Sequence, residues 1–281
     1  MAGIYKYQGK GFSVAKSFTT HPKTEEFLLH NHTGYEILFV FKGNVLQLVE
    51  GNTYNVSKND MIIVRNDEFH QLFPKDEEYE RIVIGIDKSF FEENGIEKSV
   101  SIFEERKSGE GNLITSKDNI SSGIYDCILK LDEYIKEEAP ESIINGAITE
   151  FLYRLSKINK SASPQKRTDK LIKEIIDYIS ESFNSIESID EIAEKFYISK
   201  AYLCRKFKKE TGFTLNKYIT NKKMLYVKER YKNGESLTKL ANDAGFSSYA
   251  GFYKAYTKET GKSPKKMLDW SRKNWYNFND I

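Results

Sequence analysis

The sequence predicts a protein of two domains, in which a β-barrel of the jelly-roll type with a two-helix hairpin precedes an all-α domain. Short runs of β-branched and aromatic residues, separated by glycine turns, occupy the first third of the chain. Apolar residues then recur every three or four positions, as they do in amphipathic helices. Finally, one helical pattern occurs twice between Ile189 and Met267, which indicates a single supersecondary unit used twice.

The barrel is expected within residues 1–115. The run from Glu36 to Val56 is rich in β-branched and aromatic residues and is interrupted by Lys-Gly-Asn and Glu-Gly-Asn turns. The segments from Met61 to Val64 and from Arg81 to Ile86 predict two further strands. Short strands at such close spacing are typical of a barrel or a sandwich.

Three histidines and a glutamate accompany these strands. The segment from His30 to Glu36 resembles the first motif of the cupins, in which two histidines and a glutamate surround a strand corner, and His70 stands where their second motif has its histidine. The resemblance implies a cupin-like barrel. It also makes four side chains candidate ligands for divalent iron, manganese or zinc, namely His30, His32, Glu36 and His70.

The second cupin motif is incomplete in this sequence. Asn59-Asp60 replaces the usual Gly-Asp, and the run from Asn66 to His70 lacks the usual proline and glycine. We therefore predict that the protein holds no metal and no other cofactor. In that interpretation His30 and His32 are polar residues at the mouth of the barrel.

A barrel of this size can enclose one small ligand. The candidate effector-binding residues are Tyr35, Glu36, Arg65 and His70, and the aromatic residues Phe39 and Phe41 are further candidates for the lining. The sequence does not identify the effector. A sugar, an aromatic acid and a small polar metabolite all remain open.

Residues 116–159 predict a helical hairpin, in which Pro140 separates two amphipathic helices. Their apolar residues recur at helical spacing: Ile124, Ile128, Leu131 and Ile135 in the first helix, and Ile144, Ala147, Ile148, Phe151, Leu152 and Leu155 in the second. Two arrangements remain open. The hairpin packs within one chain, or an apolar face left over from covering the barrel pairs two chains.

Residues 160–167 are polar and contain a proline, as a linker does. The second domain is therefore expected over residues 168–281. Thr168 is expected to cap its first helix, whose inward residues are Leu171, Ile172, Ile175, Ile179 and Phe183. This helix supports the first of the two repeated units.

The repeated unit has the pattern of a helix-turn-helix. In the first copy Ser188 and Glu191 form a capping box that begins a helix, and in both copies a short turn leads to a second helix. Each copy ends in Lys-Glu-Thr-Gly, so Gly212 and Gly261 are expected to end the two second helices.

The spacing of apolar residues separates the two faces of each second helix. Leu203 and Phe207 are predicted to face inward, as are Phe252 and Tyr256 in the second copy. The residues that then point outward are Ala201, Cys204, Arg205 and Lys208 in the first copy, and Tyr249, Ala250, Tyr253 and Lys254 in the second. These outward residues are the candidate DNA-binding residues.

Charge is distributed unevenly along the chain. Residues 166–281 contain 24 Lys and Arg against 15 Asp and Glu, a net charge of +9, whereas residues 1–165 have a net charge of −7. A basic half is typical of proteins that contact DNA phosphates. Seven lysines near the repeats are candidates for phosphate contacts or solvated charges: Lys200, Lys206, Lys208, Lys209, Lys222, Lys223 and Lys254.

The region from Thr168 to Trp270 resembles the DNA-binding domain of the AraC/XylS family of bacterial transcription regulators. The resemblance is carried by the paired helices, a long connecting helix over residues 216–231, and the run from Gly245 to Pro264. It implies a double helix-turn-helix domain of homeodomain-like units, with both recognition helices in successive major grooves. Two residues depart from the family pattern: Tyr197 stands where glycine is common in the first turn, and Val227 replaces a small residue.

The first hypothesis is therefore a sequence-specific transcription regulator that a small molecule in the barrel controls. The alternatives are a metal-dependent cupin enzyme fused to a DNA-binding domain, and an architectural DNA-binding protein without an effector. The incomplete second motif favours a regulator over an enzyme, so no catalytic residue is predicted.

The expected partners are double-stranded DNA, an unidentified small-molecule effector, a second copy of the chain in a homodimer, and RNA polymerase. No apolar run approaches the length of a membrane span, so no membrane partner is predicted and the expected location is cytoplasmic.

Overall fold

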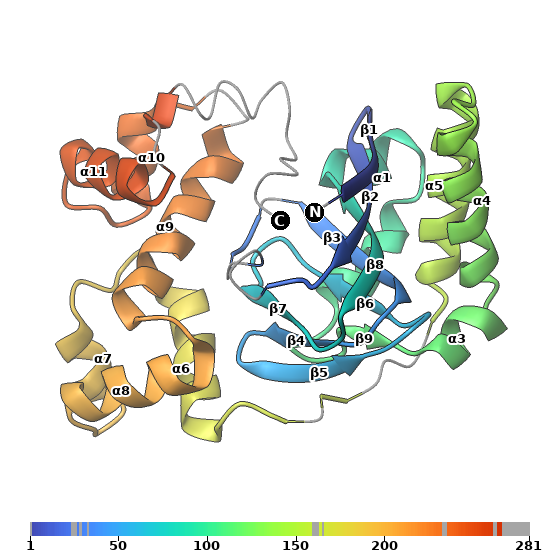
Figure 1. Cartoon of the computed structure of the whole chain (residues 1–281). Coiled ribbons are helices and arrows are strands. Elements are labelled where there is room, and N and C mark those ends of the chain that lie inside the picture. Colours follow the sequence, from blue (N-terminus) through green and yellow to red (C-terminus); the bar gives the residue numbers. More distant parts are fainter. Residues whose placement is uncertain are drawn as a thin grey trace. The chain divides into compact units, whose positions relative to one another are not determined.

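The structure is a computed structural model that describes residues 2–23, 27, 30–32, 34–158, 163–164, 166–231, 235–260 and 263–265. Contacts between Cα atoms group the chain into two units that divide between Arg167 and Thr168. The first unit contains all the strands found in the described residues, and the second is built from helices (Figure 1).

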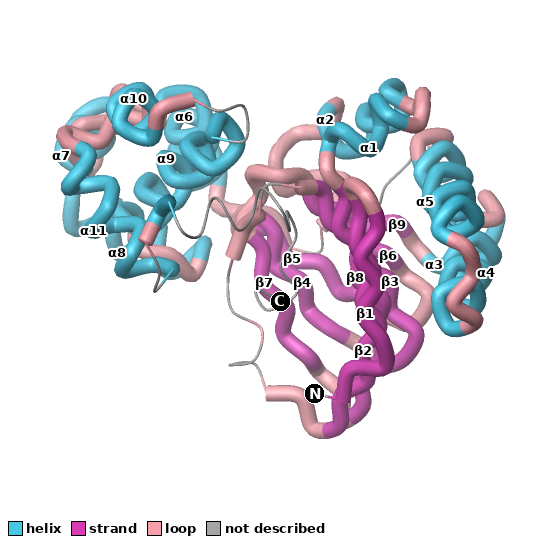
Figure 2. Tube along the Cα trace, turned by 90° about the horizontal axis from the view of Figure 1, so that it is seen from above, coloured by secondary structure: helices cyan, strands magenta, loops and turns pink. Residues whose placement is uncertain are grey.

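Two antiparallel sheets form the first unit (Figures 1 and 2). The six-stranded sheet has the order β1-β2-β8-β3-β6-β9, with bounds β1 Ala2–Gly9, β2 Phe12–Thr20, β8 Glu78–Ile86, β3 Tyr35–Lys42, β6 Met61–Val64 and β9 Leu113–Ile114. The three-stranded sheet has the order β5-β4-β7, with bounds β5 Asn52–Val56, β4 Val45–Val49 and β7 His70–Pro74. Both sheets contribute residues to one enclosed pocket, as expected for a barrel-like sandwich.

The central strand β3 is buried on both faces, and its residues alternate between two environments. Tyr35, Ile37 and Phe39 belong to a hydrophobic core that also contains residues of the helices. Glu36 and Leu38 instead line the pocket between the two sheets. The sheet therefore has a helix-covered face and an inner face, and the site of interest lies on the inner face.

The helices of the first unit are α1 Lys88–Glu93, the 3-10 helix η2 Glu97–Val100, α2 Ser101–Glu104, α3 Ser116–Ser121, α4 Ile124–Lys136 and α5 Glu141–Leu155. The α4–α5 hairpin packs on the six-stranded sheet, as Figures 1 and 2 show, through residues such as Ile128, Leu131 and Ile148. The prediction of a single helix between residue 116 and Pro140 is wrong. Gly123, with a φ of 73°, breaks it into α3 and α4.

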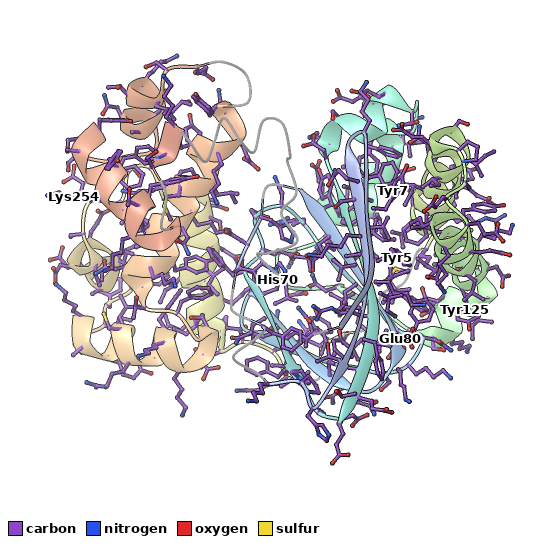
Figure 3. The ribbon with its side chains drawn as sticks, turned by 45° about the horizontal axis from the view of Figure 1, so that its top comes forward. Tyr5, Tyr7, His70, Glu80, Tyr125 and Lys254 are labelled. Carbon is purple, nitrogen blue, oxygen red and sulfur yellow. The ribbon has the colours of Figure 1, made fainter. Side chains whose placement is uncertain are left out.

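A buried ion pair fixes α4 to the sheet. Asp132 accepts hydrogen bonds from the Tyr5 hydroxyl (2.9 Å) and from Lys16 Nζ (2.8 Å), and Lys16 also lies 3.1 Å from Glu80. Figure 3 shows Tyr5 between its strand and the helical hairpin. The buried apolar residues of the hairpin belong to the core of the first unit.

The end of the predicted linker is tied to the barrel. Lys166 O accepts a hydrogen bond from Thr53 N (3.0 Å) on β5, and Arg167 lies 3.5 Å from Glu110.

The second unit contains α6 Lys170–Ser182, α7 Ile189–Lys195, α8 Lys200–Thr211, α9 Leu215–Tyr231, α10 Leu237–Asp243 and α11 Tyr249–Thr260. The pairs α7–α8 and α10–α11 are the two helix-turn-helix units, and α9 connects them. Asp169, rather than Thr168, caps α6, because its carboxylate accepts from Leu171 N.

Most of the predicted helix ends are confirmed. The Ser188 hydroxyl accepts from Glu191 N at the start of α7, and Gly212 ends α8 in the left-handed conformation. Gly261 lies outside the described residues. Among the helices described, none is long and apolar enough to cross a membrane.

Candidate effector pocket and DNA-binding faces

The pocket of the first unit lies between the two sheets. Its lining residues come from both sheets and from the segment before β3: Phe27, His30, Glu36, Leu38, Gln47, His70, Leu72, Arg81 and Val83. Figure 3 labels His70, the first residue of β7. The cavity has a volume of about 20 Å³, which is room for about one water molecule as it stands.

One end of the pocket carries a cluster of four side chains, His30, His32, Glu36 and His70, whose nearest ligand atoms lie within 4.8 Å of one another. His32 Nε2 is 3.2 Å from Glu36 Oε2, and His70 Nε2 is 3.5 Å from Glu36 Oε1. His30 reaches the cluster because its backbone pairs with that of His70 in an isolated β-bridge. The four residues singled out from the sequence are thus brought together.

The other ring nitrogens of the cluster face backbone carbonyls. His32 Nδ1 lies 2.8 Å from Gly34 O, and His70 Nδ1 lies 3.0 Å from Glu68 O. When Nδ1 carries the hydrogen and donates to such a carbonyl, Nε2 is left with a lone pair. That lone pair then faces a carboxylate oxygen, which also only accepts. A proton or a metal ion is needed between them.

Protons can fill this role. Burial alone raises the pKa of the Glu36 carboxyl, but hydrogen bonds from His32 and His70 outweigh burial and hold that pKa well below its ordinary value. Burial lowers the pKa of His70, yet Glu36 outweighs burial there too, so the net pKa is raised. The cluster therefore favours the ionised carboxylate of Glu36 and the protonated form of His70.

The residues also fit a metal ion. Three imidazoles and one carboxylate suit a divalent transition metal, and histidine ligands in metal sites usually donate their second nitrogen to a carbonyl, as His32 and His70 are placed to do. An ion held by these four residues would supply a Lewis-acidic position for an oxygen atom of a ligand. The expectation of a protein without metal stays a prediction.

Two predicted effector residues lie elsewhere. Tyr35 faces away from the pocket, because neighbouring residues of a strand point to opposite faces, and its ring packs on Phe91 and Phe103. Arg65 is occupied by Asp67, with Nε and Oδ1 2.6 Å apart. Phe39 and Phe41 lie, with Tyr35, in the helix-covered core rather than in the pocket lining.

Sequence reasoning missed six lining residues, namely Phe27, Leu38, Gln47, Leu72, Arg81 and Val83, of which Gln47 and Arg81 carry polar side chains. Arg81 stands at the start of the apolar run of β8, and Gln47 lies between Leu46 and Leu48 in β4. A polar residue at an inward position of a buried strand is a usable signal for a ligand site.

The second unit presents two helix faces. On α8, Leu203 and Phe207 are fully buried, while Ala201, Arg205 and Lys208 are exposed and Cys204 is half-buried. On α11, Phe252 and Tyr256 are fully buried, while Ala250, Tyr253 and Lys254 are exposed. Tyr249, which was also predicted to point outward, is half-buried and packs against Phe252. Figure 3 shows Lys254 directed away from the helical core. The predicted inward faces of both helices are confirmed.

Comparisons with known proteins agree with this geometry. Residues 18–110 match the model of an AraC-like ligand binding domain, and residues 192–269 match that of a helix-turn-helix domain. The chain is 36% identical over 86 residues to the multiple antibiotic resistance protein MarA of Salmonella typhimurium, covering 30% of this chain and 68% of MarA. It is 23% identical over 258 residues to YfiF, an uncharacterized HTH-type transcriptional regulator of Bacillus subtilis, covering 88% of this chain and 80% of YfiF. It is also 23% identical over 255 residues to the HTH-type transcriptional activator RhaS of Yersinia pestis, covering 85% of this chain and 88% of RhaS.

The chain belongs to the AraC family of transcription regulators. It is a DNA-binding regulator with a ligand-binding N-terminal domain and a helix-turn-helix C-terminal domain, as the first hypothesis stated. Its relatives are regulators rather than enzymes.

In this AraC-family domain the lysines near the repeats differ in whether they are available to contact DNA phosphates. Lys200 is paired with Asp190 (2.7 Å) and Lys206 with Asp169 (2.8 Å). Lys222 and Lys223 are buried, so their prediction as phosphate contacts or solvated charges is wrong. The exposed cations without an ion pair, among the residues described, include Arg205, Lys208, Lys209 and Lys254.

The structure accommodates Tyr197, where the family commonly has glycine, because the tyrosine side chain is exposed. Tyr197 has a φ of 55°, in the left-handed region, and its equivalent Gly245 in the second turn has a φ of 80°. Tyr197 is 95% exposed, so its side chain meets no obstacle. Val227 is fully buried in the core between α9, α10 and α11.

Proposed function

We propose that this regulator reads a specific DNA sequence with the exposed faces of α8 and α11, and that a small molecule in the barrel pocket controls this binding. The observation that carries the proposal is the duplication of one helix-turn-helix unit, in which the outer face of each second helix has an exposed cation without an ion pair among the described residues, Arg205 in α8 and Lys254 in α11. Because the proposed target is the chromosome, we place the protein in the cytoplasm.

The residue types on these faces suit different contacts. Arg205 can bond to guanine with two hydrogen bonds, and Ala201 can touch a thymine methyl group. Cys204, Tyr249, Ala250 and Tyr253 offer further groove contacts. Lys208 and Lys254 are assigned to phosphates, which position a protein on DNA and make its affinity depend on salt.

Replacing Arg205 by alanine is expected to weaken binding to the preferred sequence by about 1 to 3 kcal/mol and to relax specificity at one base pair. The preferred sequence is first obtained by selection from random DNA with the full chain. The matched control is Lys209→Ala on the same helix. This change should weaken binding to specific and random DNA equally, and it should lower the number of counterions released on binding by about one. An equal loss on specific and random DNA for Arg205→Ala would contradict its role in base reading.

We also propose that the protein is a homodimer that uses the outer side of the α4–α5 hairpin. The support is that Leu129, Ile143 and Tyr153 remain 40%, 48% and 52% exposed after the hairpin has covered the sheet. Leu129→Glu is expected to shift the mass measured by analytical ultracentrifugation from dimer to monomer. Ile4→Glu on β1, 46% exposed, should leave the mass unchanged. A monomeric wild-type chain would refute the dimer.

Regulation by this protein is proposed to include contact with RNA polymerase. The support is that one relative, RhaS, is named a transcriptional activator. We further propose that the pocket binds its ligand without transforming it, since the relatives that match both domains are named as regulators.

A further inference from the structure

Outside the histidine cluster, the pocket lining contains two buried polar side chains with atoms that the described residues leave without a hydrogen-bond partner. Arg81 is 4% exposed and Gln47 is 2% exposed. Arg81 Nε and Gln47 Oε1 are buried and have no hydrogen-bond partner in the part of the chain that the structure describes. No carboxylate among those residues lies within ion-pair distance of Arg81. Buried polar groups are normally paired, so both side chains point to a missing ligand.

Aromatic rings hold the Arg81 guanidinium in place. Its Cζ lies 4.7 Å from the centre of the Phe27 ring and 5.3 Å from that of the Tyr79 ring. Such contacts use the flat face of a guanidinium and leave its in-plane N–H groups available for an acceptor. Tyr79 adds no negative charge, because burial raises the pKa of its hydroxyl to about 12, although Arg81 acts in the opposite direction.

Glu36, the one acid among the described lining residues, is already paired within the histidine cluster. Glu36 lies between His32 and His70, at 3.2 and 3.5 Å, so its charge is compensated within the cluster. Arg81 is therefore the uncompensated charge of the lining, and its natural complement is a planar anion that accepts two hydrogen bonds. The cavity of about 20 Å³ has room for about one water molecule, so its lining has to move apart to admit such an anion, and this favours a small one.

We propose that the effector is a short-chain organic carboxylate, bound through its carboxylate group by Arg81 and hydrogen-bonded by Gln47. The inference rests on the proposed function, because it names the chemical class of the molecule that controls DNA binding. It narrows the choice left open by the sequence to an acid and excludes a neutral sugar.

Isothermal titration of the full chain tests this class directly. The probes are glycolate, lactate, pyruvate and malonate, and the matched neutral probes are lactamide and malonamide. At least one acid is expected to bind, and the matching amide should bind at least about tenfold more weakly. Arg81→Met should lower the affinity for the acid by about tenfold to a hundredfold. The proposal is overturned if none of the acids binds at 10 mM, if amides bind equally well, or if Arg81→Met binds as wild type does.

The stability of the ligand-free chain gives a second, independent test. Removing an unpaired buried charge relieves its desolvation, so Arg81→Met should raise the melting temperature by about 2 to 6 °C. The matched control is Lys16→Met, a buried cation of the same sheet that is paired with Asp132 and should lose stability. If Arg81→Met is destabilised like Lys16→Met, Arg81 serves a structural ion pair and the carboxylate site is refuted.

Gel-shift titration of the same Arg81→Met protein separates this inference from the proposed function. The variant is expected to bind the selected DNA as the ligand-free wild type does, and to lose any response to the acid. If the wild type binds an acid but no DNA, the proposed function fails and the pocket assignment stands. If the wild type binds DNA but none of the acids, the carboxylate site is refuted and the proposed DNA-binding function stands.

Discussion

Replacing Glu68 by alanine is expected to destabilise the barrel by about 3 to 5 kcal/mol, the cost typical of breaking a buried ion pair from one side. The Glu68 side chain is fully buried and accepts hydrogen bonds from Arg106, Gly109 N, Asn112 Nδ2 and Arg65 N. Its removal would leave buried backbone donors without an acceptor and the Arg106 guanidinium without its carboxylate partner. Chemical unfolding of the full chain, followed by hydrogen exchange in residues 61–114, measures the effect.

Two variants calibrate this expectation. Glu68→Gln keeps the shape of the side chain but loses its charge, so an intermediate loss is expected. Glu78→Ala removes an exposed ion pair with Lys42, in which both side chains are about half exposed, and should change stability by less than about 1 kcal/mol. A Glu68→Ala protein as stable as Glu78→Ala would show that the network contributes little.

The same network predicts the acid response of the barrel. Burial raises the pKa of Glu68, but Arg106 and the surrounding donors outweigh it and leave a lowered pKa in the folded state. The unfolded chain then binds the proton more readily, so this stabilisation is present above the ordinary glutamate pKa and is lost as the pH falls through the folded pKa. Asp132 also has a lowered pKa and adds to the loss of stability in acid. The part due to Glu68 is therefore measured as the difference between wild type and Glu68→Gln in how the free energy of unfolding changes with pH.

The second domain was the more predictable part of the chain. Helical spacing fixed the buried faces of α8 and α11, because each short helix packs on one side only and its apolar residues mark that side. The long helix α9 was different. It is buried on several sides, including at Lys222 and Lys223, so no single apolar stripe indicated which of its lysines face solvent.

The pocket could be predicted only in part. The spacing of His30, His32 and Glu36 located the cluster, but every residue of β3 from Tyr35 to Val40 is buried, so alternation could not tell which face would line the pocket. The prediction of Tyr35 as an effector-binding residue was wrong for this reason. Arg81 and Gln47 line the same pocket from different sheets, and such proximity of distant segments leaves no local pattern in the sequence. The N-terminal hairpin of β1 and β2 was not predicted either.

A buried lysine and a glycine join the two helix-turn-helix units. Lys223 Nζ donates to Ile186 O (3.1 Å), in the loop before α7, and to Gly245 O (2.8 Å), in the turn after α10. Gly245 itself packs on the same loop, because a Cβ added to it would lie 2.0 Å from Asn184 O. The spacing of the two recognition helices therefore depends on how closely this turn approaches the loop.

Gly245→Ala is consequently expected to destabilise the second unit by about 3 kcal/mol, of which about 1 to 2 kcal/mol comes from the left-handed backbone and the rest from the clash with Asn184. The matched control is Tyr197→Ala, at the same place in the first turn, where the backbone is equally left-handed but the side chain is exposed. That change should be almost neutral, and Tyr197→Gly should stabilise by about 1 kcal/mol. Hydrogen exchange in residues 168–260 measures the opening free energy of the unit in each protein.

Gly245→Ala is also expected to weaken DNA binding. A turn pushed away from Asn184 changes the distance between α8 and α11, and two helices that must enter successive grooves together tolerate little change in spacing. Affinity for the selected sequence should fall by more than tenfold, while contacts made by one unit alone persist on a half-length site. If Gly245→Ala and Tyr197→Ala cost the same in both assays, close packing against Asn184 does not set the spacing of the two units.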